Sequence, residues 1–307
     1  MRSVLWAAVV GIGCSGAKGG GDDTGGGGGD DGGGGGSDRF AEFINVTTAP
    51  VGDFTGFEAG FDGNGGAWLS QTVDPSKVTE VGFTGTVEDF QENTPVADAT
   101  VEMWFSDVIA GSPDFTDVSD AAGLVTGTVP TCAPLAYKTS TDPALAETKN
   151  TFEAHQVYGA DASVDDILNS VSTTTYQIIP SLLGVSPDGD KGTVAGTAYD
   201  SNGDPVEGAQ VVVKDANGNI PDSLVVKYFV DSFPNRNQLY TSPDGLWVAI
   251  NLPPGEYTIE MYVSDGAEGH LLMGATVLSV YADSINISNV YTGFGDGVKY
   301  PSSCLAG

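Results

Sequence analysis

The sequence predicts an all-β protein: two antiparallel β-sandwich domains after a disordered tether, with one short helix between them. Three observations lead to this prediction. Apolar side chains alternate with period two over many short segments, which is the pattern of half-buried strands. Clusters of glycine, proline, asparagine and aspartate interrupt these segments as turns do. A pattern of strands and turns that begins near residue 193 is also present, in a weaker form, from residue 81, which indicates an internal repeat.

Residues 1–13 are predicted to be a signal peptide, because Arg2 precedes an apolar run that is too short to span a bilayer. Small residues then lead to Cys14, an arrangement that resembles a bacterial lipoprotein signal. The resemblance implies cleavage before Cys14 and a lipid on its thiol, so that Cys14 anchors the protein to a membrane. Ser15 in place of aspartate favours an outer-membrane or cell-surface lipoprotein. The alternative is an ordinary secretory signal.

Residues 14–39 consist of the lipidated cysteine and a linker that is rich in glycine and aspartate. The linker has no apolar side chains that could repay the entropy of ordering, so we expect a disordered tether with an end-to-end distance of roughly 25–30 Å. A glycine-rich phosphate-binding loop is rejected, because no Lys-Ser/Thr pair follows the glycines.

The second sandwich is expected over residues 191–307, where the repeated pattern is clearest. Apolar residues alternate in four segments that are separated by turn formers such as Asn202-Gly203 and Pro205. Four short strands in about seventy residues, without a helix, are typical of a β-sandwich. The segments are 193–199, 209–214, 246–250 and 257–263.

This region resembles the carboxypeptidase regulatory-like domain. The matching residues are Gly196, Asp200, Pro205, Val206, Gly208, Ala209, Val211, Asp244, Gly245, Leu246, Leu252, Pro253, Pro254, Gly255 and Tyr257. The resemblance implies a transthyretin-like (prealbumin-like, Ig-like) sandwich that serves as an accessory module of secreted and cell-surface proteins and is not itself a peptidase. Ala198 departs from the family, which has a larger apolar residue there. The fold alone does not identify a function.

The first sandwich is expected over residues 40–160 as a divergent copy of the second. Residues 40–78, with Phe43, Trp68 and Leu69, are expected to add short strands that complete or cap this first sandwich. The two copies align at Gly85 with Gly196, Asp89 with Asp200, Pro95 with Pro205, Ala99 with Ala209, Val101 with Val211, Ser119 with Ser242, and Gly123 with Gly245.

Residues 161–190 are predicted to link the two domains. Ser163 begins a segment that resembles a capping box, and the apolar residues after it have helical spacing, which predicts a short helix over about 163–171. The following TTTYQII has the composition of a strand.

The formal net charge is −30, with 41 acidic against 11 basic residues. This charge excludes nucleic acid as a partner, because DNA and RNA are bound by basic surfaces. The simplest interpretation is an acidic surface that keeps an extracellular protein soluble, and the alternative is a site for cations or a basic partner.

Cys132 and Cys304 remain once Cys14 carries the lipid. An exported chain favours a disulfide between them, which would join the C-terminal tail or the second domain to the first. The alternative is two buried free thiols.

No catalytic, cofactor or metal site is predicted. His155 and His270 lie in different domains without metal-ligand partners, and no nucleophile motif is present. Residues 200–204 resemble the start of a calcium loop, but Val211 occupies the position of the required glutamate, and a β-turn explains the segment.

Two further hypotheses concern individual side chains. The fold also resembles pilin domains with a Lys–Asn isopeptide bond, for which Lys191, Asn286 or Asn289, and Glu260 are candidates. Aromatic residues on outer faces could instead form a saccharide platform, although packing is their commoner role in strands. These aromatics are Trp104, Trp247, Tyr199 and Tyr262.

The sequence therefore favours a non-catalytic, lipid-anchored protein of the cell envelope that acts as a structural, adhesive or scaffolding module. The alternative is a carbohydrate- or peptide-binding surface protein that serves polymer degradation. A glycan or another envelope protein is the expected partner in either case, besides the membrane that holds the lipid.

Overall fold

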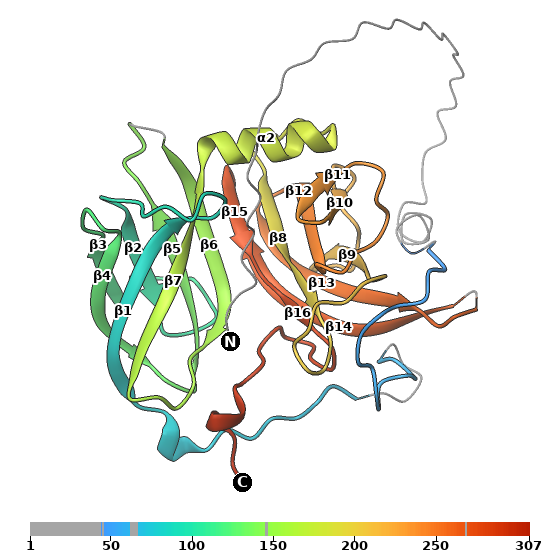
Figure 1. Ribbon diagram of the computed structural model, residues 1–307, viewed down its shortest axis with the longest axis horizontal. Coiled ribbons are helices and arrows are strands. Elements are labelled where there is room, and N and C mark those ends of the chain that lie inside the picture. Colours follow the sequence, from blue (N-terminus) through green and yellow to red (C-terminus); the bar gives the residue numbers. More distant parts are fainter. Residues whose placement is uncertain (1–43, 45, 62–66, 145–146, 268) are drawn as a thin grey trace, which may run out of the picture.

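The computed structural model describes residue 44 and residues 46–61, 67–144, 147–267 and 269–307. Within these residues strands predominate, so the all-β prediction is confirmed. Figure 1 shows two β-rich halves side by side, with helix α2 (Thr173–Leu183) lying across one end of both. The predicted signal peptide, Cys14 and the tether lie outside the described residues.

The first half is a sandwich of two sheets around its own core. One sheet has the order β4-β1-β7, and the other has the order β3-β2-β5-β6. Phe83, Met103 and Leu168 are among the buried residues between the sheets. The strands are β1 (Glu80–Asp89), β2 (Thr100–Trp104), β3 (Phe115–Val118), β4 (Leu124–Pro130), β5 (Pro134–Ser140), β6 (Thr148–Val157) and β7 (Ser163–Ser172).

The second half repeats this plan around a separate core that includes Val194, Trp247 and Met261. Its sheets have the orders β11-β10-β12-β8-β15 and β14-β13-β9, and β16 pairs with the end of β8. The strands are β8 (Gly192–Tyr199), β9 (Gln210–Asp215), β10 (Val225–Val230), β11 (Phe233–Asn235), β12 (Leu246–Leu252), β13 (Gly255–Ser264), β14 (His270–Val280), β15 (Ser284–Ile287) and β16 (Val290–Tyr291).

Strand β15 joins the two halves into one continuous sheet. It pairs in parallel with β8 of its own half and, on its other edge, with β6 of the first half. Asn286, for example, lies between Phe152 and Val194 in the two registers. The halves are therefore connected by backbone hydrogen bonds as well as by the chain.

The prediction of antiparallel sandwiches is wrong at the last strand of each half. Strand β7 runs parallel to β1, and β15 and β16 run parallel to β8. In each half the chain crosses from one sheet to the other before its last strand. The last strand then lies beside the first strand of the half and runs in the same direction.

The internal repeat is visible in the hydrogen bonds of the first turn of each half. The backbone amide of Ala99 donates to Ser119 Oγ (2.9 Å), and the amide of Ala209 donates to Thr241 Oγ1 at the same distance. Thr241, and not Ser242, is therefore the partner of Ser119 in the repeat, which corrects the sequence alignment by one residue.

The glycines that follow these hydroxyl residues also correspond. The amide of Val87 donates to the carbonyl of Gly123, and the amide of Ala198 donates to that of Gly245 (2.8 and 2.9 Å). Both glycines have positive φ (+76° and +68°), a region that favours glycine. The two halves thus share the local geometry of this turn, although few of their side chains are identical.

The predicted helix over 163–171 is wrong, because this segment is strand β7 of the first sandwich. Burial alternates along it, with Val164 and Leu168 inside and Asp165 and Ile167 outside, and β1 pairs with it over eight residues. Residues 163–172 thus belong to the first sandwich and not to a linker.

The helix of this region is α2, which begins after the N-cap Ser172 and ends at Gly184 (φ +74°). Its residues had suggested a strand. The apolar side chains of Ile179 and Leu183 pack on a cluster from β10 and β12 that includes Phe229 and Val248. This packing overrides the β-propensity of the threonine-rich segment.

The N-terminal segment does not cap the first sandwich as expected. Its amides at Val51, Phe61 and Leu69 donate to carbonyls of the second half, at Glu207, Leu272 and Gly293. Residues 67–74 have no strand pairing beyond one bridge, and the chain then enters the 3₁₀ helix η1 (Pro75–Lys77). Phe43 lies outside the described residues.

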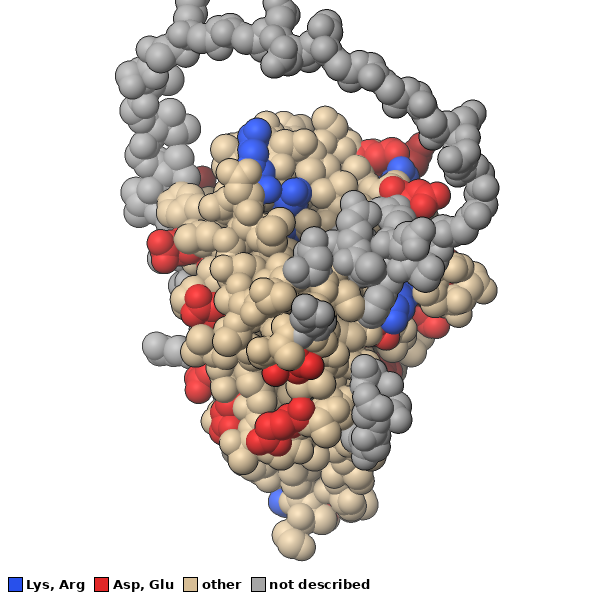
Figure 2. Space-filling model, turned by 90° about the vertical axis from the view of Figure 1, so that its right-hand side faces the viewer, with Lys and Arg blue, Asp and Glu red and all other residues tan. Residues whose placement is uncertain are grey.

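The surface agrees with the acidic composition. Figure 2 shows, on the face of the second half, scattered patches of Asp and Glu and few basic groups. Within the described part of the chain, no helix has both the length and the hydrophobicity needed to cross a bilayer.

Candidate functional site

A groove of about 700 Å³ lies between the two sandwiches, below helix α2. Its size is within the range of ligand-binding pockets, about 300–1,000 Å³. One wall comes from β1 and β7, the other from β8 and β12, and residues of β6 and β15 lie between them. The groove exists because β15 holds the halves side by side and α2 covers one end (Figure 1).

The first wall is the outer face of the β1–β7 pair. The parallel register places Thr86 beside Ile167 and Glu88 beside Asn169, with Asp165 two residues before Ile167 on β7. The residues next to them in the sequence point into the core. The period-two alternation of a strand therefore turns these polar residues and Ile167 outward. Ile167 is 43% exposed, which is unusual for isoleucine in a strand.

The opposite wall and the covering helix are largely apolar. Helix α2 contributes Tyr176, Ile179 and Pro180, and the sheet contributes Leu246 and Val248. These residues continue the cluster that holds α2 on the sheet. The groove therefore has a polar, acidic side and an apolar side.

A buried polar network lies at the junction of β6 and β7. Glu153 accepts hydrogen bonds from the Tyr137 hydroxyl, from Asn169 Nδ2 (2.9 Å) and from Gln156 Nε2 (2.7 Å). Burial away from water raises the pKa of Glu153 to about 7, although its hydrogen bonds oppose this. The pKa of nearby Asp166 is also raised by burial, and this carboxylate accepts from Tyr158 (2.9 Å).

Trp247 does not present its side chain to the groove, although it belongs to a strand that forms one wall. Its ring shares a face of β12 with Ala249 and packs in the core of the second sandwich, whereas Leu246 and Val248 on the other face pack beneath α2. The indole Nε1, which has no hydrogen-bond acceptor among the described residues, is therefore out of reach of a ligand in the groove.

The carboxylate of Glu153 has a structural role in the groove. Both oxygens of Glu153 are engaged as acceptors in a link between strands, so its raised pKa has a structural cause. In the described chain, no three His, Cys, Asp or Glu residues are arranged to hold a metal ion.

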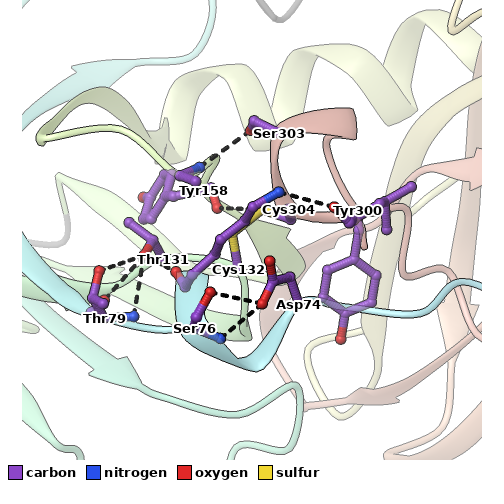
Figure 3. The surroundings of a disulfide bond; sticks show 12 residues. Asp74, Ser76, Thr79, Thr131, Cys132, Tyr158, Tyr300, Ser303 and Cys304 are labelled. Carbon is purple, nitrogen blue, oxygen red and sulfur yellow. Dashed lines mark hydrogen bonds between the residues drawn. A yellow bond between two sulfur atoms is a disulfide. The ribbon is translucent and has the colours of Figure 1, made fainter. Parts of the chain in front are cut away.

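Cys132 and Cys304 form a disulfide, with sulfur atoms 2.16 Å apart (Figure 3). The bond fastens the C-terminal 3₁₀ helix η2 (Ser302–Cys304) to the first sandwich. Segment 72–77 closes over the same place, because the amide of Asp74 donates to the carbonyl of Cys304 (3.0 Å) and Lys77 Nζ donates to that of Leu305 (2.9 Å). The segment that leads into the first sandwich and the C-terminal segment thus meet beside the disulfide.

The two histidines have packing roles. His155 Nε2 lies 2.7 Å from the carbonyl of Val277, and His270 Nε2 lies 2.7 Å from that of Val46. Burial lowers the pKa of His155, which favours its neutral form.

The structure also bears on the calcium-loop and isopeptide hypotheses. Asp200 Oδ1 accepts from the amides of three following turn residues, as the β-turn interpretation requires. The isopeptide candidates have other partners: Lys191 pairs with Asp188 (3.1 Å) and Glu260 pairs with Lys214 (2.6 Å).

The proposed saccharide platform on outer faces is wrong for three of its members, since Trp104, Trp247 and Tyr262 are buried. The ring of the fourth, Tyr199, stacks on Tyr291 with 5.1 Å between centroids. Local sequence patterns do not identify the groove, because its lining comes from strands of both halves.

Comparisons with known proteins add little. No protein-family model matches the sequence, and no curated protein does so. Among solved structures, the chain is similar to the shaft pilin SpaA of Lactobacillus rhamnosus GG, with 11% identity over 72% of this chain and 100% of that chain and a TM-score of 0.23. It is also similar to the Bacillus anthracis TIE protein, with 15% identity, 70% of this chain and a TM-score of 0.24, but spans only 34% of that chain. TM-scores this low support no conclusion about function.

Proposed function

We propose that the protein is a non-catalytic, lipid-anchored module of the cell envelope whose two sandwiches form one structural or adhesive unit. The observation that carries this proposal is the pairing of β15 with both β6 and β8, which fixes the two halves relative to each other. A fixed pair of sandwiches on a long tether is suited to presenting a surface away from the membrane. The outer membrane or cell surface is the proposed location.

The turn chemistry supports a relation of both halves to the carboxypeptidase regulatory-like domain. Residues of the second half that carry the resemblance, such as Gly245 and Ala209, make hydrogen bonds that recur at Gly123 and Ala99 in the first half. A shared ancestral module is the simplest explanation of this repetition.

The test of anchoring uses the full chain expressed in a Gram-negative host that is fed an alkyne-bearing fatty acid. The wild-type protein should take up the label at Cys14 and sediment with membranes, and Cys14→Ser should do neither. Equal labelling of the two proteins, or a soluble wild-type protein, would contradict the lipid anchor.

A second function is favoured by the groove, namely binding of a carbohydrate or peptide segment. A cavity of about 700 Å³ with an acidic wall and an apolar wall has the size and the mixed lining of a ligand site. Glycan and peptide arrays probed with the full chain test this function. Thr86→Trp, which places a large ring on the first wall, should abolish any specific binding. Unchanged binding would show that the ligand binds outside the groove.

A further inference from the structure

We propose that the groove binds an extended segment of a partner polypeptide in which Lys or Arg side chains alternate with apolar ones. The proposal rests on the second function given above and names its ligand. Two properties of the groove support it: the sign of its charge and its apolar wall.

The charge of the groove excludes anions and favours cations. Glu88, Asp89, Glu153, Asp165 and Asp166 line it, whereas its lining includes no Lys or Arg. Within the described residues, the carboxylates of Glu88 and Asp165 have no hydrogen-bond or ion-pair partner, so both can accept a charged hydrogen bond from an ammonium or guanidinium group.

The other three carboxylates of the lining are already engaged. Asp89 accepts from the amides of Gln91, Glu92 and Ser172. Glu153 and Asp166 belong to the buried network described above. The free charges thus lie on the first wall only, and a bound cation is expected beside β1 and β7.

The apolar wall requires more than a simple cation. Ile179, Leu246 and Val248 lie opposite the carboxylates, and Ile167 adds an exposed apolar group to the acidic wall itself. A small hydrophilic amine would leave this apolar surface exposed to water. A ligand that carries apolar side chains next to basic ones would bury it, with a gain of about 25 cal/mol per Å².

An extended peptide fits two facing walls of different chemistry, because successive side chains of an extended chain point to opposite sides. Its basic side chains can face Glu88 and Asp165 while the alternate apolar ones face the opposite wall. A saccharide fits less well, since Trp247 and Tyr176 are buried and Tyr199 is covered by Tyr291, which leaves little aromatic face for a sugar ring. The chain's own tether is rich in aspartate and would be repelled.

The test is a fluorescence-anisotropy titration of the full exported chain in uncharged detergent, with empty micelles as the blank. The probe is a short labelled peptide of alternating leucine and lysine, compared with the same peptide carrying glutamine in place of lysine. The lysine peptide should bind more tightly, and its affinity should fall as salt is raised, because the charges are partly exposed.

Two matched pairs of variants locate the site. Glu88→Gln with Asp165→Asn should weaken binding of the lysine peptide about three- to tenfold, whereas Glu80→Gln with Glu256→Gln, the same change of charge outside the groove, should leave it unchanged. Ile167→Ser should weaken binding about threefold, and Ile178→Ser, an equally exposed residue outside the lining, should have no effect.

Equal binding of the two peptides, or equal effects of the groove and control variants, would overturn the proposal. Binding of a neutral oligosaccharide such as cellohexaose, abolished by Thr86→Trp, with no binding of the lysine peptide, would also overturn it while leaving the binding function in place. Failure of the anchored structural unit is detected separately, by fatty-acid labelling of Cys14, so the outcomes are distinguishable.

Discussion

Asn286 in β15 donates its side-chain amide to the backbone carbonyl of Thr193 in β8, with 3.0 Å between Nδ2 and the oxygen. The same amide nitrogen lies 3.1 Å from Ser284 Oγ. Asn286 is 1% exposed, so these bonds are shielded from water. The strand that joins the halves is therefore held to β8 by a side chain in addition to the backbone ladder.

Replacement of Asn286 by Asp should destabilise the whole protein. The change removes the donor to Thr193 and places a buried carboxylate beside a carbonyl oxygen, at a cost of at least about 3 kcal/mol. Urea unfolding of single-tryptophan variants should show Trp104 in the first half and Trp247 in the second losing stability together. Asn237→Asp, at an exposed site, should change stability by less than about 0.5 kcal/mol; separate transitions of the two tryptophans would mean that the halves are independent.

The glycine after the hydroxyl residue in each turn should not tolerate a side chain. A Cβ at Gly245 would lie 2.8 Å from the carbonyl oxygen of Ala198, and φ there is +68°. Gly245→Ala should therefore cost about 2–4 kcal/mol, from the backbone strain and the clash together. Gly218→Ala, with φ of +81° and open space around it, should cost only about 1 kcal/mol in the same thermal or urea unfolding. Equal effects would show that the turn is looser than described.

Loss of the disulfide should loosen the C-terminal segment. Cys132 and Cys304 are 172 residues apart in sequence, so the bond closes a long loop of the unfolded chain, and Cys132→Ser with Cys304→Ser should lower stability by about 2–4 kcal/mol. Intact-mass measurement before and after reduction should show a gain of two hydrogen atoms in the wild type. The same mass under both conditions would contradict the bond.

Stability should depend on pH through Glu153. Burial raises its folded pKa to about 7 from 4.5, so the folded state holds the proton more tightly than the unfolded chain does. This contribution is fully present below pH 4.5 and is lost as pH rises through 7. Glu153→Gln keeps an acceptor for Tyr137 but cannot ionise, so the variant should be more stable than the wild type at pH 8.

The comparison of unfolding free energies at pH 5 and pH 8 separates this effect from others. The pKa of Asp166, also raised by burial, acts in the same direction, so the Gln variant should retain a reduced slope. His155, whose pKa burial lowers, contributes stability above pH 6.5 that is lost as pH falls, which is the opposite sign. A Gln variant that loses as much stability from pH 5 to pH 8 as the wild type would contradict the assignment to Glu153.

The local pattern was sufficient to predict the strands and turns of the repeated motif, at 193–199, 209–214, 246–250 and 257–263. Asp200 accepts from amides of its own turn and Gly245 has a positive φ in its turn, and the repeat places the same features at Asp89 and Gly123. Such turn features depend on residues that are close in the sequence, so they can be predicted from the local sequence.

Features that depend on distant partners were not predictable in this way. Residues 163–171 fit helical spacing, yet their alternation also fits a strand, and only the free edge of β1 decides between the two. The threonines of α2 favour a strand, and the apolar face of β10 and β12 makes the segment a helix. The groove depends on both outcomes and on the position of β15, so its residues could not be identified from local signals.

The most direct test of the shared sheet is native-state hydrogen exchange of the β15 amides at Ser284–Ile287. If β15 joins the halves, the protected amides of this strand should exchange only through global unfolding, with the same opening free energy as those of Val194 in β8 and Phe152 in β6. Exchange of the β15 amides through a low-energy local opening, while Val194 and Phe152 stay protected, would contradict the account of two sandwiches fixed as one unit.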